Sequence, residues 1–149
     1  MRPDWITDEG YLDVLKLPLG PIVTQALNAD PESSRSACSV LASMAGRGGL
    51  EAGVVLLGLL AHHRDDATRV APVIEALGRF ASRATVEALA GELYRVPSTN
   101  ATRGYLNTVL SALTRLPREL WEDRVTAMSS DGRFSPRWRA KFEDALWES

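Results

Sequence analysis

Apolar residues in this chain recur at a fixed interval of 36 positions over three consecutive segments. Equivalent positions in the first helices hold Ala37, Val73 and Val109; Cys38, Ile74 and Leu110; Leu41, Leu77 and Leu113; and Met44, Phe80 and Leu116. Those in the second helices hold Gly53, Leu89 and Val125, and Val54, Ala90 and Thr126. Each segment is long enough for two short helices, and a repeat of about 20–50 residues built from two helices is typical of α-solenoids. Because one helix pair cannot bury its apolar face alone, the repeat predicts neighbouring pairs stacked on a continuous core.

The spacing within each segment is helical. The clearest pattern lies near residues 69–81, where Val70, Val73 and Leu77 fall on one face of a 3.6-residue period. Similar patterns, bounded by Asp, Ser and Pro start signals and by Gly and Pro stop signals, predict helices over residues 31–46, 50–62, 83–96, 100–116, 118–131 and 135–148. No segment shows the alternation of a β-strand.

Two parts of the chain depart from this regular pattern. Residues 50–62 are apolar almost all round, so we expect that helix to be enclosed between others. Before residue 31 we expect one or two short helices, near Asp8–Lys16 and Pro21–Asn28, separated by the segment Pro18–Pro21.

We therefore predict a single all-α domain over residues 1–149, a right-handed α-solenoid of antiparallel helix pairs. Residues 1–30 form an N-terminal cap, residues 31–131 the helix pairs, and residues 135–148 a C-terminal capping helix.

The repeat resembles HEAT-like, armadillo-type helical repeats over about residues 33–130. The resemblance rests on Pro72 in a first helix, on the run from Ala76 to Phe80, and on Val86 with Ala90 in a second helix. Ser82 and Glu87 stand where the family usually has an Asp and an Arg. The resemblance implies a curved scaffold that binds other macromolecules, and fold alone does not fix the partner.

Composition excludes several function classes. The net charge is −2, and a single cysteine with two histidines leaves no disulfide framework and no Cys-based zinc site. The first residues lack a signal-peptide pattern, and the most apolar stretch, residues 50–61, is shorter than the roughly 20 residues that span a bilayer. We expect a cytoplasmic protein with no membrane partner, no cofactor, no metal and no catalytic residues, and hence not an enzyme.

Two sets of reactive side chains have simpler interpretations. Cys38 could be a nucleophile, but it shares its repeat position with Ile74 and Leu110, which predicts a buried structural cysteine. His62 and His63 could suggest a metal site, but neighbouring helical residues point about 100° apart. We expect them to belong to a polar loop that follows the apolar helix.

Four residues are candidates for partner binding. Glu51, Glu87 and Asp123 share one repeat position, which in a solenoid makes a carboxylate ladder for a basic peptide or protein. Alternatively, acids are favourable near the first turns of helices whatever their function. Trp147 is the aromatic most expected to be an exposed anchor, whereas Trp121 and Trp138 are expected inside.

These features favour a non-enzymatic protein–protein interaction module or scaffold, an adaptor or an inhibitor of the immunity-protein type. The alternative is a HEAT-like protein that binds duplex DNA through arginines in its turns and at its helix ends. Those residues are Arg47, Arg79, Arg83, Arg95, Arg115 and Arg118.

Overall fold

The computed structural model describes Asp4, Glu9 and residues 13–148, and within this part every regular element is a helix. In chain order they are η1 (Val14–Lys16), α1 (Leu19–Ala26), α2 (Pro31–Gly46), α3 (Leu50–His63), α4 (Ala67–Leu77), α5 (Arg83–Arg95), α6 (Arg103–Arg115), α7 (Arg118–Ser129) and α8 (Pro136–Trp147). The predicted all-α class is confirmed. Among the described residues, no helix combines the length and the apolar character needed to cross a membrane.

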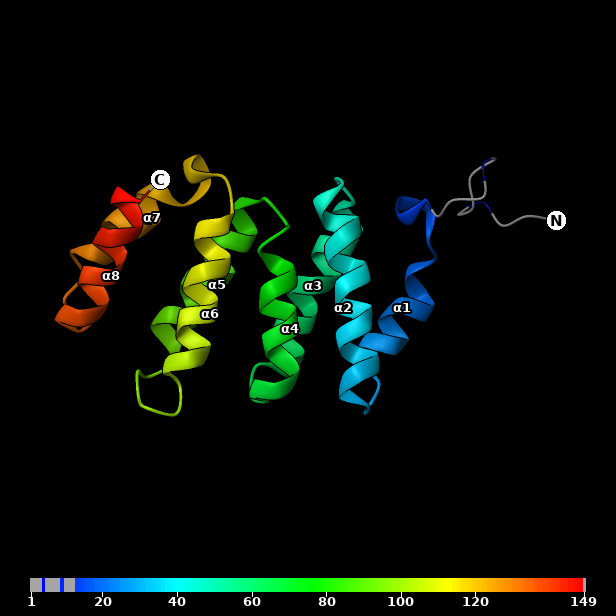
Figure 1. Cartoon of the computed structure of the whole chain (residues 1–149), viewed down its shortest axis with the longest axis horizontal. Helices are drawn as coiled ribbons and strands as arrows, with labels where there is room; N and C mark the ends of the chain where they lie inside the picture. The colour runs from blue at the N-terminus through cyan, green and yellow to red at the C-terminus, as the bar shows by residue number, and fades with distance from the viewer. Residues whose placement is uncertain (1–3, 5–8, 10–12, 149) are drawn as a thin grey trace. The chain divides into compact units, whose positions relative to one another are not determined.

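Helices that follow one another in sequence pack together. The chain divides into two compact units, residues 1–80 and residues 81–149. In the N-terminal unit, α2 packs against α1, α3 and α4, and α3 also contacts α4 (Figure 1). In the C-terminal unit, α5 packs against α6 and α7, and α8 packs against α7.

The repeated apolar positions form the cores of the two units. Nearly all of the residues aligned by the 36-residue repeat are buried, and the set includes Ala37, Cys38, Leu41, Met44, Val73, Ile74, Leu77, Phe80, Val109, Leu113 and Leu116. Leu110 is half-buried, and two of the aligned second-helix residues, Val54 and Thr126, are exposed. Trp121 and Trp138 are buried too, as predicted.

Side-chain caps fix where four helices begin. Asp30 accepts a hydrogen bond from the Glu32 amide at the start of α2, and Asp66 accepts two from the first turn of α4. Ser82 and Ser135 accept from the amides three residues on, at the starts of α5 and α8. Each such cap contributes about 1 kcal/mol to helix stability.

Several predicted boundaries are wrong for local reasons. α1 spans Leu19–Ala26 rather than Pro21–Asn28, so only Leu17 and Pro18 separate it from η1. The helix can begin before Pro21 because a proline in the first turn has no helical hydrogen bond to lose. α4 ends at Leu77 rather than at residue 81. α6 begins at Arg103 because a turn precedes it. In this turn the Thr102 hydroxyl accepts a hydrogen bond from the Thr99 amide, and the Thr99 hydroxyl accepts one from the Thr102 amide. The predicted helix Asp8–Lys16 lies largely outside the described residues, and its described end is η1.

The prediction that residues 50–62 are enclosed on all sides is also wrong. Leu50 and Val54, one helical turn apart on α3, keep 67 % and 58 % of their surface exposed. α1, α2 and α4 are the elements that pack on α3, and they cover its other faces. α3 therefore exposes an apolar stripe formed by Leu50 and Val54.

Two glycines permit close packing around α3, one in the turn that leads from α2 and one beside Phe80, which follows α4. Gly48 has a φ of +90°, a backbone conformation that side chains disfavour, and it turns the chain between α2 and α3. Gly53 lies against the ring of Phe80, where a Cβ atom would come within 2.3 Å of a ring carbon.

Gly53→Ala should therefore lower the free energy of unfolding by about 1–3 kcal/mol, because the buried ring of Phe80 cannot yield without disturbing its neighbours. Gly58→Ala on the same helix is the matched control. Its Cβ would meet nothing within 4 Å, so it should raise the stability by about 0.5–1 kcal/mol. Denaturant unfolding followed by circular dichroism measures both, and equal effects would contradict the packing at Gly53.

Candidate functional site

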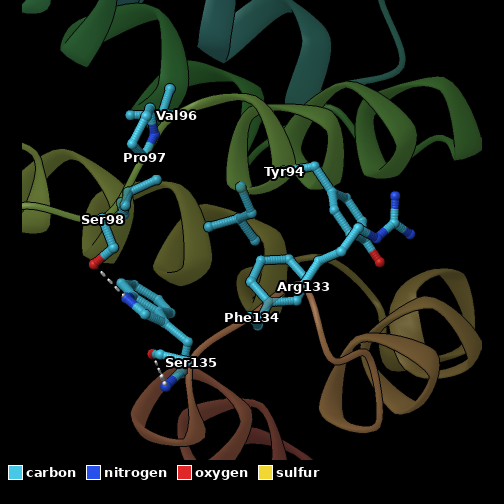
Figure 2. A pocket seen from close by; sticks show the side chains of 10 residues that line it. Tyr94, Val96, Pro97, Ser98, Arg133, Phe134 and Ser135 are labelled. Carbon is cyan, nitrogen blue, oxygen red and sulfur yellow. Dashed lines mark hydrogen bonds between the residues drawn. The ribbon is translucent and has the colours of Figure 1, made fainter.

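A cleft of about 340 Å³ opens in the C-terminal unit, between the end of α5 and the loop that leads into α8 (Figure 2). Its lining residues are Leu93, Tyr94, Val96, Pro97, Ser98, Leu106, Arg133, Phe134, Ser135 and Trp138. The volume lies at the lower end of the range for small-ligand pockets, roughly 300–1,000 Å³. It suits one or two side chains of a partner or a small molecule.

Aromatic contacts hold the walls of this cleft in place. Trp138 donates from Nε1 to the Ser98 hydroxyl oxygen over 2.8 Å, which ties α8 to the segment after α5 (Figure 2). The ring of Phe134 lies 4.6 Å from that of Tyr94 and 4.9 Å from that of Phe142, measured between centroids. These contacts favour a preformed site over one that assembles on binding.

An ion-pair network forms one rim. The Tyr94 hydroxyl donates to Asp131 over 2.8 Å, and the Arg133 guanidinium donates to both oxygens of the same carboxylate. Hydrogen bonds from Arg133 and Tyr94 hold the pKa of Asp131 far below its usual range. The pKa of Tyr94 is raised, first by partial burial and then by its hydrogen bond to Asp131. Arg133 also stacks 4.5 Å over the Tyr94 ring while its side chain stays 75 % exposed, which leaves one guanidinium face open.

The solvent face of α8 carries the most exposed large apolar side chain in the described chain. Trp147 keeps 87 % of its surface exposed at the end of the helix. The exposed residues of α8 are Pro136, Arg137, Ala140, Glu143, Asp144 and Trp147. At 100° per residue they cover one face, opposite the buried Trp138 and Phe142.

Charges on α8 run against the preference of the helix itself. Basic side chains occupy its first half, at Arg137, Arg139 and Lys141, whereas Glu143 and Asp144 lie near its C-terminal end. The helix dipole favours the reverse order, by about 0.3–1 kcal/mol for each charge near an end. The helix dipole therefore does not explain this order, and such departures from local preference are expected at functional sites.

The predicted carboxylate ladder is only partly a set of free acids. Glu87 on α5 accepts a hydrogen bond from the Arg124 guanidinium on α7 at 2.5 Å, so it is engaged in an ion pair within the chain. Asp123 is exposed on α7 and Glu51 is exposed on α3, both without an ion pair among the described residues. Glu51 belongs to the N-terminal unit, whereas Glu87 and Asp123 belong to the C-terminal unit.

Two of the six arginines proposed for nucleic-acid contact are also engaged. Arg95 binds Glu92 at 2.6 Å, and Arg118 binds Glu122 at 3.5 Å and the Leu146 carbonyl at the end of α8. The other four, Arg47, Arg79, Arg83 and Arg115, are exposed.

Glu92 is a feature that sequence analysis missed. It is 1 % exposed and accepts two hydrogen bonds from Arg95, at 3.1 and 2.6 Å, and one from the Tyr105 hydroxyl at 2.9 Å. The sequence does contain a signal that Glu92 is buried, because the equivalent positions of the other two segments hold the apolar residues Leu56 and Met128. A buried carboxylate held by several donors gives the C-terminal unit a polar centre.

The other reactive side chains lie in the N-terminal unit. Cys38 is 1 % exposed, which confirms its core position, and burial raises its pKa to about 11. It lies at a second cleft, of about 290 Å³, between α2 and α4, which Arg35, Glu75 and Arg79 also line.

The prediction that His62 and His63 belong to a polar loop is wrong, because both lie in the last turn of α3. His63 is 8 % exposed, and its Nε2 finds no partner in the described structure. Burial, followed by the charge of Arg69, lowers its pKa, and a hydrogen bond to the Ala26 backbone opposes the shift.

Among the described residues, no group of three or more His, Cys, Asp or Glu side chains is arranged to hold a metal ion. No family model, curated protein or solved structure matches this chain.

Tyr105→Phe should lower the free energy of unfolding by about 1.5–3 kcal/mol, because it removes a donor from the buried Glu92 carboxylate. Tyr94→Phe is the matched control. Its acceptor, Asp131, keeps the Arg133 bonds and is half-buried, so this change should cost less. A larger loss for Tyr94→Phe in denaturant unfolding would contradict this assignment.

The Cys38 thiol should resist modification in the native protein. With a pKa of about 11, almost none of it is thiolate at pH 8, and the side chain is enclosed. Ellman's reagent should react slowly in buffer and at once in denaturant. Rapid reaction of the folded protein would show that the second cleft gives access to Cys38.

Proposed function

We propose that this chain is a non-enzymatic protein-binding module whose binding surface is the exposed face of α8. The observation that carries the proposal is Trp147, 87 % exposed at the end of that helix. Tryptophan and arginine are the side chains most often found at the energetic centres of protein interfaces, and both are present on this face.

Two further observations support the proposal. The acids around Trp147 are placed where the helix dipole disfavours them, so a partner rather than the fold accounts for them best. The α7–α8 pair beneath the face is firmly held, since Arg118 of α7 donates to the Leu146 carbonyl at 2.6 Å. A rigid support lowers the entropy cost of binding.

The repeat of apolar positions every 36 residues supports this role. We propose that it reflects a HEAT-like α-solenoid, an architecture that presents helix surfaces to other macromolecules. Asp123 on α7 lies on the neighbouring helix and would extend the acidic part of the surface. If the partner is an enzyme, the chain acts as an inhibitor or immunity-type protein; if it is a structural protein, the chain acts as an adaptor.

Trp147→Ala should abolish capture of the partner while leaving the fold intact, because the side chain is exposed and makes no core contact. We expect at least a roughly thirtyfold loss of affinity, the range of an interface hot spot. The measurement is quantitative mass spectrometry of proteins retained by the immobilised chain from a nuclease-treated lysate, followed by titration of the captured protein.

Leu50→Ala is the control, since it removes another large exposed apolar side chain, 67 % exposed, from the N-terminal unit. A partner retained equally by the wild type, Trp147→Ala and Leu50→Ala would refute the proposed surface. Loss of all captured protein on nuclease treatment would instead favour the arginines as a nucleic-acid surface.

A further inference from the structure

We infer that the contact between the end of α1 and the helices α2, α3 and α4 is a pH-sensitive switch, which opens when His63 is protonated. The switch lies within the N-terminal unit and does not depend on the proposed binding surface of α8. The observations that carry it are the polar contacts at the end of α1, the burial of the His63 ring and the charges around that ring.

α1 has little apolar surface to hold it in place. Of its eight residues, Ala26 in the last turn is the one that is buried. A helix of this length is not stable alone in water, and burial of apolar surface is the main favourable contribution when helices pack. The attachment of α1 therefore depends largely on the polar contacts at its end.

Side chains from three helices hold the backbone at the end of α1, and we call this group of contacts the α1 junction. Ser34 of α2 donates to the Ala26 carbonyl at 2.8 Å, and a hydrogen bond joins the His63 ring of α3 to the backbone of the same residue. Arg69 of α4 donates to the Ala29 carbonyl, just beyond the helix, at 3.2 Å. One change at this junction therefore affects every contact between the end of α1 and its neighbours.

His63 is buried in its neutral form. The residue is 8 % exposed, and because its ring bonds the Ala26 backbone, the atom left without a partner in the described structure is Nε2. A proton on Nε2 would create a buried, positively charged N–H group with no acceptor, which is among the costliest groups to bury. The Nε atom of Arg69 is also buried without a partner, so the junction has no spare acceptor to offer.

The charged groups around His63 also oppose its protonation. Arg69 of α4 carries a like charge, and His62, its neighbour on α3, adds to the effect when protonated. Asp66 is the acid that acts on His63, but its carboxylate already accepts hydrogen bonds from the first amides of α4. α1 has no titratable side chain. From α2 the Cys38 thiol, on which Arg69 also acts, is uncharged because burial raises its pKa to about 11.

The direction of the pH dependence follows from these contacts. Burial, and then the charge of Arg69, lowers the pKa of His63 below its ordinary value of about 6.5. When α1 is released, water reaches the ring and the pKa returns to that value. The closed junction therefore has its full stability above about pH 6.5 and loses it as the pH falls from there to the lowered pKa. Over this interval the equilibrium constant for release should rise about tenfold for each pH unit.

Hydrogen exchange of the full chain, measured by mass spectrometry from about pH 8 to about pH 5, tests the switch. This range lies above the pH at which ordinary carboxyl groups titrate. After correction for the intrinsic exchange rate, protection of the α1 amides should be constant above about pH 7 and should fall below about pH 6.5, by up to tenfold per pH unit. The amides of α3 should stay better protected than those of α1 throughout. Equal loss of protection in both helices would show general unfolding and would overturn the inference.

His63→Asn and His62→Asn separate the switch from other effects of acid. The Asn side chain can donate a hydrogen bond but cannot be protonated in this range, so protection of α1 in His63→Asn should be independent of pH. His62→Asn, the same substitution at the exposed neighbour, should keep the wild-type dependence. Because the readout is the slope with pH, it remains informative where a substitution weakens the junction at every pH.

Nuclear magnetic resonance titration of the His63 ring in the wild type gives a second readout that needs no variant. Its pKa in the folded chain should lie below its pKa in the denatured chain. Equal values would overturn the inference. So would a wild type whose α1 protection does not change between pH 7 and pH 5, or a His63→Asn chain that keeps the wild-type slope.

Discussion

Each helix of this protein is too short to be stable alone, and its one apolar stripe must be covered by a neighbour. The α-helices range from 8 residues in α1 to 16 in α2, close to or below the length at which isolated helices are marginal in water. Stability therefore comes from the packing of helices against each other. Most buried positions recur at the same place in each segment because each helix must cover its apolar stripe against a neighbour. Where a neighbour is missing, as at Leu50 and Val54, apolar surface stays exposed.

This constraint explains how much of the fold could be predicted from the sequence. Periodicity identifies a helix and its buried face, and a cap such as Asp30 or Ser135 fixes its first residue, because both signals are local. The exposure of α3 could not be predicted in this way, since it depends on which helices pack around it. The late start of α6 depends on a turn closed by the hydroxyls of Thr99 and Thr102. Such side-chain hydrogen bonds to the backbone compete with helix formation, and apolar periodicity carries no information about them.

The candidate site shows a similar division. The exposure of Trp147 was expected because the apolar face of the helix predicted over residues 135–148 carries Trp138, Phe142 and Leu146 and leaves Trp147 off it. The cleft was not expected, since its walls come from segments about 40 residues apart, joined by the bond from Trp138 to Ser98. The ion pair of Glu87 was also missed, because its partner Arg124 lies one repeat later in the chain.

The buried carboxylate of Glu92 has a consequence for how the chain folds. Segments with similar apolar patterns can pair out of register, one repeat too early or too late, and tandem repeats are prone to such misassembly. Glu92 has its donors in place only where Tyr105 and Arg95 meet it, while the equivalent positions in the other segments are Leu56 and Met128. A pairing shifted by one repeat would leave a charge among apolar side chains, at a cost of several kcal/mol. One polar residue thus distinguishes α5 from α3 and α7, the helices that carry Leu56 and Met128, and opposes pairing out of register.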